Sequence, residues 1–385
     1  MQFFSISQTL LNMIRSRYLS ACLCLLIATP LVAIEPVTVV TPEFAAHPRQ
    51  PQVAVDEAGV IYIAFGAGES VYVCKSKDFG KSYSNPVQVA TVPKLALGMR
   101  RGPRISASKN SVVISAISHE SGNLLAWNSS DGGESWSMPI VVNNIPNVAR
   151  EGLHGMAMGK SGIVFCAWLD LRNKGTQIFG SSSKDGGQTW SENRQVYASP
   201  SGTVCECCHP SVALDSAGAI YVMWRNLLDG DRDMFVATSE DGGQTFSEGR
   251  KLGKGSWKLD ACPMDGGFLA VASPGQLSTV WRREKQIYQV DEHRQTLQLT
   301  EQRLGTGEQP WATATSEGVM TVWISRRGGE LWLSSSPSRE PTKLTDHAND
   351  PAIASSMITN GPIVTVWETG TKPNTSIVAM VVSEP

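Results

Sequence analysis

The chain has 385 residues, of which 41% are hydrophobic and 18% are charged, and its formal net charge is −2. This hydrophobic content supports a large core, and the length allows one evenly repeated domain or two to three smaller ones. The near-neutral charge argues against nucleic acid or another polyanion as a partner, because such partners select strongly basic chains.

The first 33 residues resemble an export signal. Arg15 and Arg17 form a basic stretch, residues 19–32 are mostly apolar, and Ala33 ends a small-residue cleavage site. The apolar stretch is short for a membrane span, and no second hydrophobic span follows it. We therefore expect a periplasmic or extracellular protein that begins near Ile34, with its cysteines in an oxidising compartment.

After this segment, short strand-like runs recur in a fixed order. In the first unit, residues 51–55 and 60–65 flank a turn, a third run leads into residues 76–83, and a fourth run covers residues 86–89. Short β-branched and aromatic runs punctuated by Gly, Asn and Asp predict antiparallel strands. Four strands per unit are typical of a β-propeller blade.

The first two strands of each unit can be followed along the whole chain. First strands begin near Pro51, Pro103, Gly155, Pro210, Gly267, Pro310 and Pro351, and second strands end in Phe65, Ile117, Trp168, Trp224, Trp281, Trp323 and Trp367. These positions predict an all-β, seven-bladed propeller over residues 34–385, with a six-bladed ring as the alternative. We interpret the aromatic residues as packing between blades.

The seventh unit ends before a fourth strand is complete. Residues 35–39 closely match the fourth strands at residues 85–89 and 138–142. We therefore expect the N-terminal strand to complete the last blade and close the ring, which removes the exposed edges of an open sheet.

One motif, Ser-x-Asp-x-Gly-x-(Ser/Thr)-aromatic, occurs four times at intervals of about fifty residues. Its aspartates are Asp78, Asp131, Asp185 and Asp241. The aspartate and hydroxyl suit a tight turn between the third and fourth strands, and the glycine permits a positive φ angle. We expect these four motifs to stabilise the fold and not to carry chemistry.

The repeated motif resembles the Asp-box, or bacterial neuraminidase repeat, of sialidase-like β-propellers. The resemblance implies a sugar-binding site on the face away from the boxes, where three arginines hold a substrate carboxylate. Arg49 or Arg101 matches the first arginine, Arg225 resembles the second, and Arg282 is one of several candidates for the third. We add Arg104, which lies on the same predicted face.

The catalytic residues that the resemblance implies are missing from their places. The loops at residues 66–70 and 118–123 contain no aspartate for the acid/base role, and no tyrosine follows Tyr288 to act as the nucleophile. Sialidases of this type are also six-bladed. The resemblance therefore covers the architecture and leaves the activity open.

The most unusual local feature is a group of cysteines. Cys205, Cys207, Cys208 and His209 are nearly consecutive, and Cys262 occupies the corresponding place before the next unit. In an exported protein the first interpretation is a disulfide between neighbouring blades, which would contribute roughly 2–4 kcal/mol. A zinc or copper site and a redox-active pair are the alternatives. Cys74 and Cys166 fall within strands and are expected to be buried.

Three functional hypotheses remain. The first is a binding module for an acidic or carbohydrate ligand, held by Arg49, Arg101, Arg104, Arg225 and Arg282. The second is a glycoside hydrolase, either an exo-α-sialidase with displaced catalytic groups or an enzyme that uses Glu151, Asp170 or Asp260. The third is a platform for another exported protein.

Overall fold

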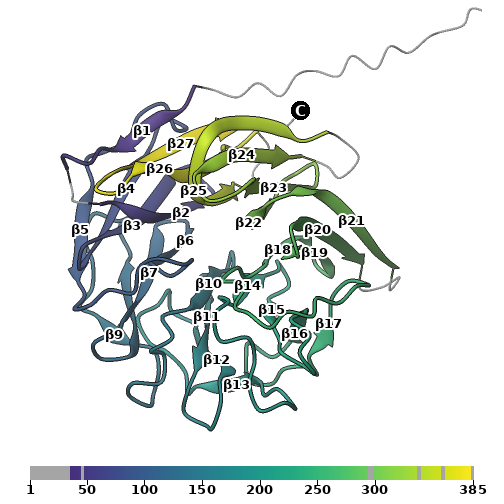
Figure 1. Ribbon diagram of the computed structural model, residues 1–385. Helices are drawn as coiled ribbons and strands as arrows, with labels where there is room; N and C mark the ends of the chain where they lie inside the picture. Colours follow the sequence, from purple (N-terminus) through teal and green to yellow (C-terminus); the bar gives the residue numbers. More distant parts are fainter. Residues whose placement is uncertain (1–34, 45–46, 294–297, 336–339, 357–359, 383–385) are drawn as a thin grey trace, which may run out of the picture.

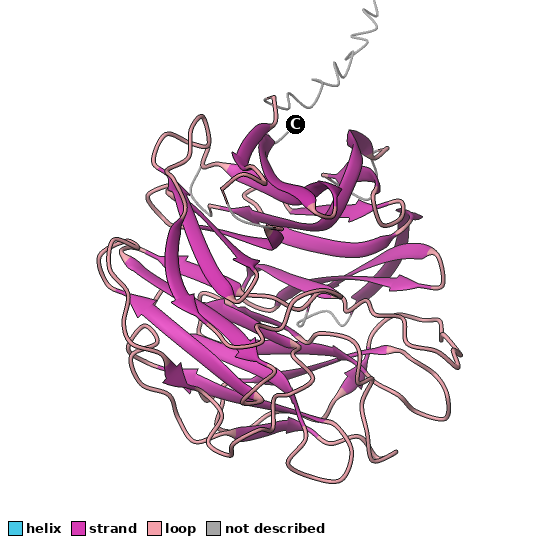
Figure 2. Ribbon diagram, turned by 60° about the vertical axis from the view of Figure 1, so that its left-hand side comes forward, coloured by secondary structure: helices cyan, strands magenta, loops and turns pink. Residues whose placement is uncertain are grey.

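The computed structural model describes residues 35–44, 47–293, 298–335, 340–356 and 360–382. Within these residues the chain forms 27 β-strands and no helix (Figure 2). The expected export signal lies outside the described residues. In the described part of the chain, no helix is long and apolar enough to cross a membrane.

Five sheets contain four strands each, paired in chain order. The first has β2 (Arg49–Val55), β3 (Ile61–Ala67), β4 (Ser70–Ser76) and β5 (Val87–Thr91), and the second has β6 (Arg104–Ser108), β7 (Ser111–Ser118), β8 (Asn123–Ser129) and β9 (Ile140–Val141). The third has β10 (His154–Met158), β11 (Val164–Asp170), β12 (Gln177–Ser183) and β13 (Arg194–Tyr197). The fourth has β14 (Ser211–Leu214), β15 (Ile220–Arg225), β16 (Met234–Ser239) and β17 (Arg250–Lys251), and the fifth has β18 (Phe268–Ser273), β19 (Gln276–Arg283), β20 (Gln286–His293) and β21 (Gln298–Thr306).

The sixth sheet has seven strands, in the order β1-β27-β26-β25-β24-β23-β22. Its members are β1 (Val37–Val40), β22 (Glu308–Ala314), β23 (Val319–Ile324), β24 (Gly329–Ser334), β25 (Thr342–Ser355), β26 (Ile363–Thr371) and β27 (Asn374–Val382). The two halves of the long strand β25 have different partners. Its first half pairs with β24, and its second half, from Asn349 onward, pairs with β26.

The sheets stand around a common axis as a β-propeller (Figure 1). The first strands contact one another in a closed circle, from β2 through β6, β10, β14, β18 and β22 to β25, which contacts β2 again. The N-terminal strand β1 pairs antiparallel with the C-terminal strand β27, and Val37 lies opposite Ala379. The expected pairing of these two ends is therefore confirmed.

The core lies between neighbouring sheets. Trp168, Trp224, Trp323 and Trp367, which lie near the ends of second strands, are almost completely buried. Trp168 packs in one cluster with Val113 and Ile117 of the preceding sheet, which is the inter-sheet contact predicted for these aromatic side chains. Cys74 and Cys166 are also buried, as expected.

The four Asp-box motifs form turns that directly follow the third strands. In each box the serine hydroxyl donates a hydrogen bond to the aspartate carboxylate. The same hydroxyl accepts a hydrogen bond from the backbone amide of the glycine that lies four residues after the serine. At Asp185 these contacts are 2.8 Å from Ser183 Oγ to Oδ1 and 2.8 Å from the Gly187 amide to Ser183 Oγ. The amide of Thr189 donates to Oδ1 over 2.9 Å. The motif therefore satisfies backbone amides of its own turn, as the sequence predicted.

These contacts affect the charge of the aspartate. Partial burial raises the pKa of Asp185, but hydrogen bonds from Thr189 and Ser183 outweigh it and lower the pKa below its ordinary value.

We predict that Asp185→Ala lowers the melting temperature by a few degrees, because three donors of the turn lose their acceptor. Thermal unfolding followed by circular dichroism measures this effect. Lys184→Ala, an exposed neighbour, is the control, and equal melting temperatures for both variants would contradict the prediction.

Candidate functional site

A cavity of about 250 Å³ lies on the axis of the ring. It is lined by the first strands of the sheets, including Gln52, Arg104, Met156, His209 and Trp311. Because the first strands all begin at the same end of this cavity, the segments that precede them meet around one opening. We call this opening the channel mouth, and define it by Arg100, Arg104, His154, His209, Asp265, Trp311, Asp350 and Glu368.

Two buried guanidinium groups, those of Arg100 and Arg104, occupy the channel mouth. Arg100 is 3% exposed and Arg104 is 4% exposed. Arg104 donates to the Arg100 carbonyl over 2.7 Å, and the Arg100 guanidinium lies 4.8 Å from the centre of the Trp311 ring. Burial and the neighbouring charge of Arg100 lower the pKa of Arg104 to about 9. Both charges are thus held in a site where they are poorly solvated.

Among the residues that the structure describes, several nitrogen atoms of these two side chains have no hydrogen-bond partner. They are Nε and Nη2 of Arg100 and Nε of Arg104. The nearest carboxylate is that of Asp350, whose Oδ1 lies 4.0 Å from Nη1 of Arg100. Unsatisfied buried donors are uncommon in folded proteins, and a cluster of them at an opening indicates a place for an external acceptor.

Two buried histidines, His154 and His209, stand beside the arginines. Burial and the charges of the nearby arginines hold the pKa of both imidazoles well below the ordinary value, so both rings are neutral at neutral pH. His154 Nε2 lies 2.9 Å from the Ser115 hydroxyl, while neither ring nitrogen of His209 has a partner. A neutral imidazole offers one donor and one acceptor.

Glycine makes room for the His209 ring. A Cβ atom on Gly266 would lie 2.6 Å from Nδ1 of His209, closer than side-chain atoms approach one another. The ring stacks on Trp311 with centroids 5.9 Å apart. The ring therefore faces the channel mouth and is separate from the cysteines that precede it.

Acidic groups complete the channel mouth. Asp265 Oδ2 accepts the Gln309 amide over 2.9 Å, while its Oδ1 has no partner. Glu368 is 6% exposed and accepts the Gln50 amide over 2.5 Å. Burial and the charge of Asp350 raise the pKa of Glu368 to about 8, so this carboxyl group keeps its proton at neutral pH.

The five arginines expected to bind a ligand have different surroundings. Only Arg104 lines the axial cavity. Arg49 is partly buried at the start of β2 with an unpartnered Nε, and Arg101 donates to the Glu151 carbonyl. Arg225 is buried and donates to the backbone carbonyls of Arg232, Asp265 and Arg282.

Arg282 is held by an acidic partner. Its Nη1 lies 2.8 Å from Glu308 Oε2, and its guanidinium and that of Arg225 each lie 5.3 Å from the centre of the Trp257 ring. Of the three acids considered for hydrolysis, Asp170 is fully buried and pairs with Arg172 over 2.8 Å. Glu151 is half-buried, and burial and the charge of Glu206 raise its pKa. These geometries favour structural roles for Arg225 and Asp170.

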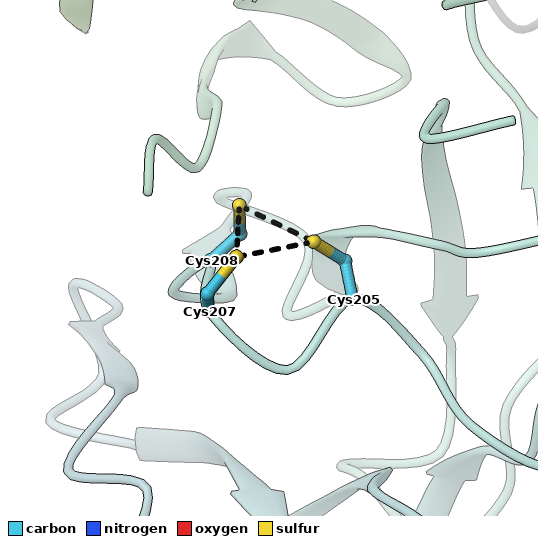
Figure 3. Close-up of side chains that lie close together, drawn as sticks. All are labelled: Cys205, Cys207 and Cys208. Atoms are coloured by element: carbon cyan, nitrogen blue, oxygen red, sulfur yellow. Dashed lines mark hydrogen bonds between the residues drawn. The ribbon is translucent and has the colours of Figure 1, made fainter. Parts of the chain in front are cut away.

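Three of the predicted cysteines form a compact cluster, which we call the thiol trio (Figure 3). The Sγ atom of Cys205 lies 3.6 Å from those of Cys207 and Cys208, and the latter two are 4.0 Å apart. All three are buried free thiols. Arg232 Nη1 donates to Cys205 Sγ over 3.1 Å.

The remaining members of the predicted group lie outside the trio. Cys262 is exposed on the segment before β18, and its thiol interacts with that of Cys207. His209 points to the channel mouth instead. The structure therefore brings Cys205, Cys207 and Cys208 together, while the ring of His209 faces the channel mouth.

Sequence reasoning missed Arg100, Asp265, Trp311, Asp350 and Glu368 as members of the site. Arg100 directly precedes Arg101, and only the fold decides which of two adjacent arginines points inward. Asp350 and Glu368 lie in the last repeat, which has no Asp-box to mark the register. A regular signal was present for part of this set, because Arg100 and Asp265 closely precede first strands.

Comparisons with known proteins agree with this architecture. The model of the BNR repeat-like domain family matches residues 110–332, more than half of the chain. No curated protein sequence matches the chain.

Solved structures resemble this chain at low sequence identity. An ulvan lyase of polysaccharide lyase family PL25 is 10% identical, with a TM-score of 0.54, over 89% of this chain and 95% of that chain. The NanB sialidase from Streptococcus pneumoniae is 12% identical, with a TM-score of 0.47, over 88% of this chain and 68% of that one. The Hadza microbial sialidase Hz136 is 17% identical, with a TM-score of 0.40, over 61% of this chain, which spans half of its length.

The buried carboxyl group of Glu368 predicts a pH-dependent stability. The folded protein keeps this proton up to about pH 8, whereas an unfolded chain loses it near the ordinary value of 4.5. The free energy of unfolding should therefore fall as the pH rises from 4.5 to about 8, and level off above, by at most about 1.4 kcal/mol per pH unit.

Glu368→Gln should remove this contribution, because the amide keeps the acceptor for the Gln50 backbone and does not titrate. Urea unfolding at a series of pH values measures the slope for both proteins. Glu120→Gln, at an exposed position, is the control and should follow the wild type. Parallel curves for the wild type and Glu368→Gln would refute the prediction.

Proposed function

The chain belongs to the BNR repeat-like domain family, and we propose that this propeller binds a small acidic carbohydrate at its channel mouth. The observation that carries the proposal is the set of unpartnered buried nitrogens on Arg100 and Arg104. A carboxylate is a suitable acceptor for them, because a guanidinium presents its donors in a planar fork that matches two oxygens.

Other groups at the channel mouth favour a sugar acid over a simple anion. The free Oδ1 of Asp265 accepts from a ligand hydroxyl, and the neutral His209 ring can donate or accept. The axial cavity of about 250 Å³ is at the lower end of the range for ligand pockets, so it suits one sugar unit better than a long chain segment.

The ulvan lyase with the same fold was solved with a saccharide that contains GlcA. This likeness concerns the fold, and it makes glucuronate a reasonable first probe. N-acetylneuraminate is the second probe, since the Asp-box pattern resembles that of sialidases.

Binding can be tested with glucuronate, N-acetylneuraminate and neutral glucose by isothermal titration calorimetry. We expect one of the acidic sugars to bind and glucose not to bind. Arg104→Lys should weaken the affinity at least about tenfold, since lysine keeps the charge but loses the fork. Arg194→Gln, at an exposed site on β13, is the control and should bind like the wild type.

Two results would overturn the proposal. One is equal binding of glucose and the acidic sugars, and the other is unchanged affinity in a folded Arg104→Lys variant. Because Arg104 is buried, Arg49→Gln provides a second variant at a partly buried position near the same opening.

The second candidate function is glycoside hydrolysis, and the protonated Glu368 is the observation that favours it. A carboxylic acid that keeps its proton at neutral pH can act as a general acid toward a glycosidic oxygen. The carboxylate of Asp265, whose Oδ1 has no hydrogen-bond partner among the described residues, is the second acid of the same opening.

Purified protein can be assayed with fluorogenic sialosides and glucuronides. If the protein is a hydrolase that uses Glu368, turnover should fall above about pH 8 and be lost in Glu368→Gln. Glu120→Gln should keep full activity. If no substrate in such a screen is turned over, hydrolysis is rejected and the binding function is retained. Capture of an exported protein partner would instead favour the hypothesis of a platform for another protein.

We further infer that the ring has seven blades. The two pairing halves of β25 allow β22–β25 and β25–β27 with β1 to be counted as two four-stranded units beside the five separate sheets. Export through the N-terminal segment remains part of the proposal, and cell fractionation with an antibody against the protein tests it.

A further inference from the structure

We propose that the thiol trio binds one thiophilic d¹⁰ metal ion, Zn²⁺ or Cu⁺, with Cys262 as the additional ligand from the neighbouring segment. This site is distinct from the channel mouth and does not depend on the sugar-binding proposal. In the part of the chain that the structure describes, one group of at least three Cys, His, Asp or Glu side chains has ligand atoms close enough to share a metal ion. That group is the thiol trio.

The spacing of the sulfur atoms fits a metal ion. A metal–sulfur distance of about 2.3 Å in tetrahedral geometry places the sulfur atoms about 3.8 Å apart. The three distances in the trio are 3.6, 3.6 and 4.0 Å. The thiols therefore already occupy three corners of a coordination tetrahedron, and an ion between them requires only small movements.

The backbone holds this arrangement in place. The Val204 amide donates to the Thr176 carbonyl over 2.9 Å, and the Cys205 amide donates to the Arg225 carbonyl over 3.1 Å. The Glu206 carboxylate accepts from the Thr203 hydroxyl, and its side chain is exposed, unlike those of the cysteines on either side. Such preorganisation lowers the entropy cost of gathering ligands for a metal ion.

A cationic side chain lies beside the trio, where it would stabilise a thiolate. Arg232 donates to Cys205 Sγ and is itself held by a bond from its Nε to the Leu259 carbonyl over 3.0 Å. A thiolate at Cys205 would therefore have a cationic hydrogen-bond donor beside it.

Further soft donors lie beside the trio. Met264 packs against the three cysteines, and the exposed Cys262 interacts with Cys207. Thiolate and thioether groups favour Cu⁺ and Zn²⁺ over hard cations. Because Cys262 precedes β18 and the trio precedes β14, a bound ion would join the lead-in segments of two adjacent sheets.

The test uses the full mature protein, reduced under anaerobic conditions and freed of metal by a chelator. It is titrated with Zn²⁺ against a competing indicator, and separately with Cu⁺ against a competing ligand. We expect one equivalent of at least one ion, and Co²⁺ should give the charge-transfer absorption of thiolate ligands.

Variants connect this uptake to the proposed ligands. Cys207→Ser should lower the affinity at least about 100-fold, and Cys262→Ser at least about tenfold. Cys262 is exposed, so its variant is expected to fold even if that of Cys207 does not. Cys74→Ser, in β4, is the matched control and should bind as the wild type does.

A second measurement does not depend on any variant. Bound metal should protect the trio from alkylation, which is read by intact mass with and without the ion. The proposal is overturned if neither ion is taken up, or if Cys262→Ser and Cys207→Ser bind as tightly as the wild type. It is also overturned if the protein, isolated without reductant, has its trio in disulfides and holds no metal.

Discussion

The convergence of the first strands on a single axis is the constraint on which the other features of this molecule depend. Seven strand segments from β2 to β25 contact their neighbours in a closed circle, so the residues just before each of them must share a narrow opening. Side chains at these positions are buried, whether they are polar or apolar. This is why Arg100 and His209 are buried although they belong to connecting segments, and why Arg104 is buried at the start of β6.

The same constraint places the stabilising Asp-boxes and the candidate binding site at opposite ends of the molecule. The third strands run in the same direction as the first strands, and the Asp-boxes follow the third strands. The boxes therefore lie at the end of the molecule opposite the channel mouth. Their aspartates use their oxygen atoms within their own turns, as Asp131 does with Ser129 and Ser135. The channel mouth, in contrast, keeps polar atoms without partners, which a scaffold tolerates better when its turns elsewhere are fully hydrogen-bonded.

Much of this fold could be predicted from the sequence, because it depends on local patterns. Alternating runs predicted the strands, and buried tryptophans marked the second strands. The site was harder to predict, since it depends on register. Arg100 and Arg101 are adjacent, yet one is buried over Trp311 and the other reaches the Glu151 carbonyl. His209 follows Cys208 directly, but the chain enters β14 there and turns the ring toward the axis. The long strand β25 was also unexpected as a single element, because its two halves match two different units of the repeat.

The pairing of β1 with β27 has a consequence for how the molecule is made. Val37 and Ala379 are neighbours in one sheet, although more than 300 residues separate them along the chain. A ribosome delivers the first of these strands long before the second, so the early strand must wait without its partner while the intervening sheets assemble. Contacts between such distant segments slow folding, and an unpaired strand edge is prone to aggregation until it is covered. Strand β27 therefore decides whether β1 is protected, and a truncation that removes β27 would leave the edge of β1 unpaired.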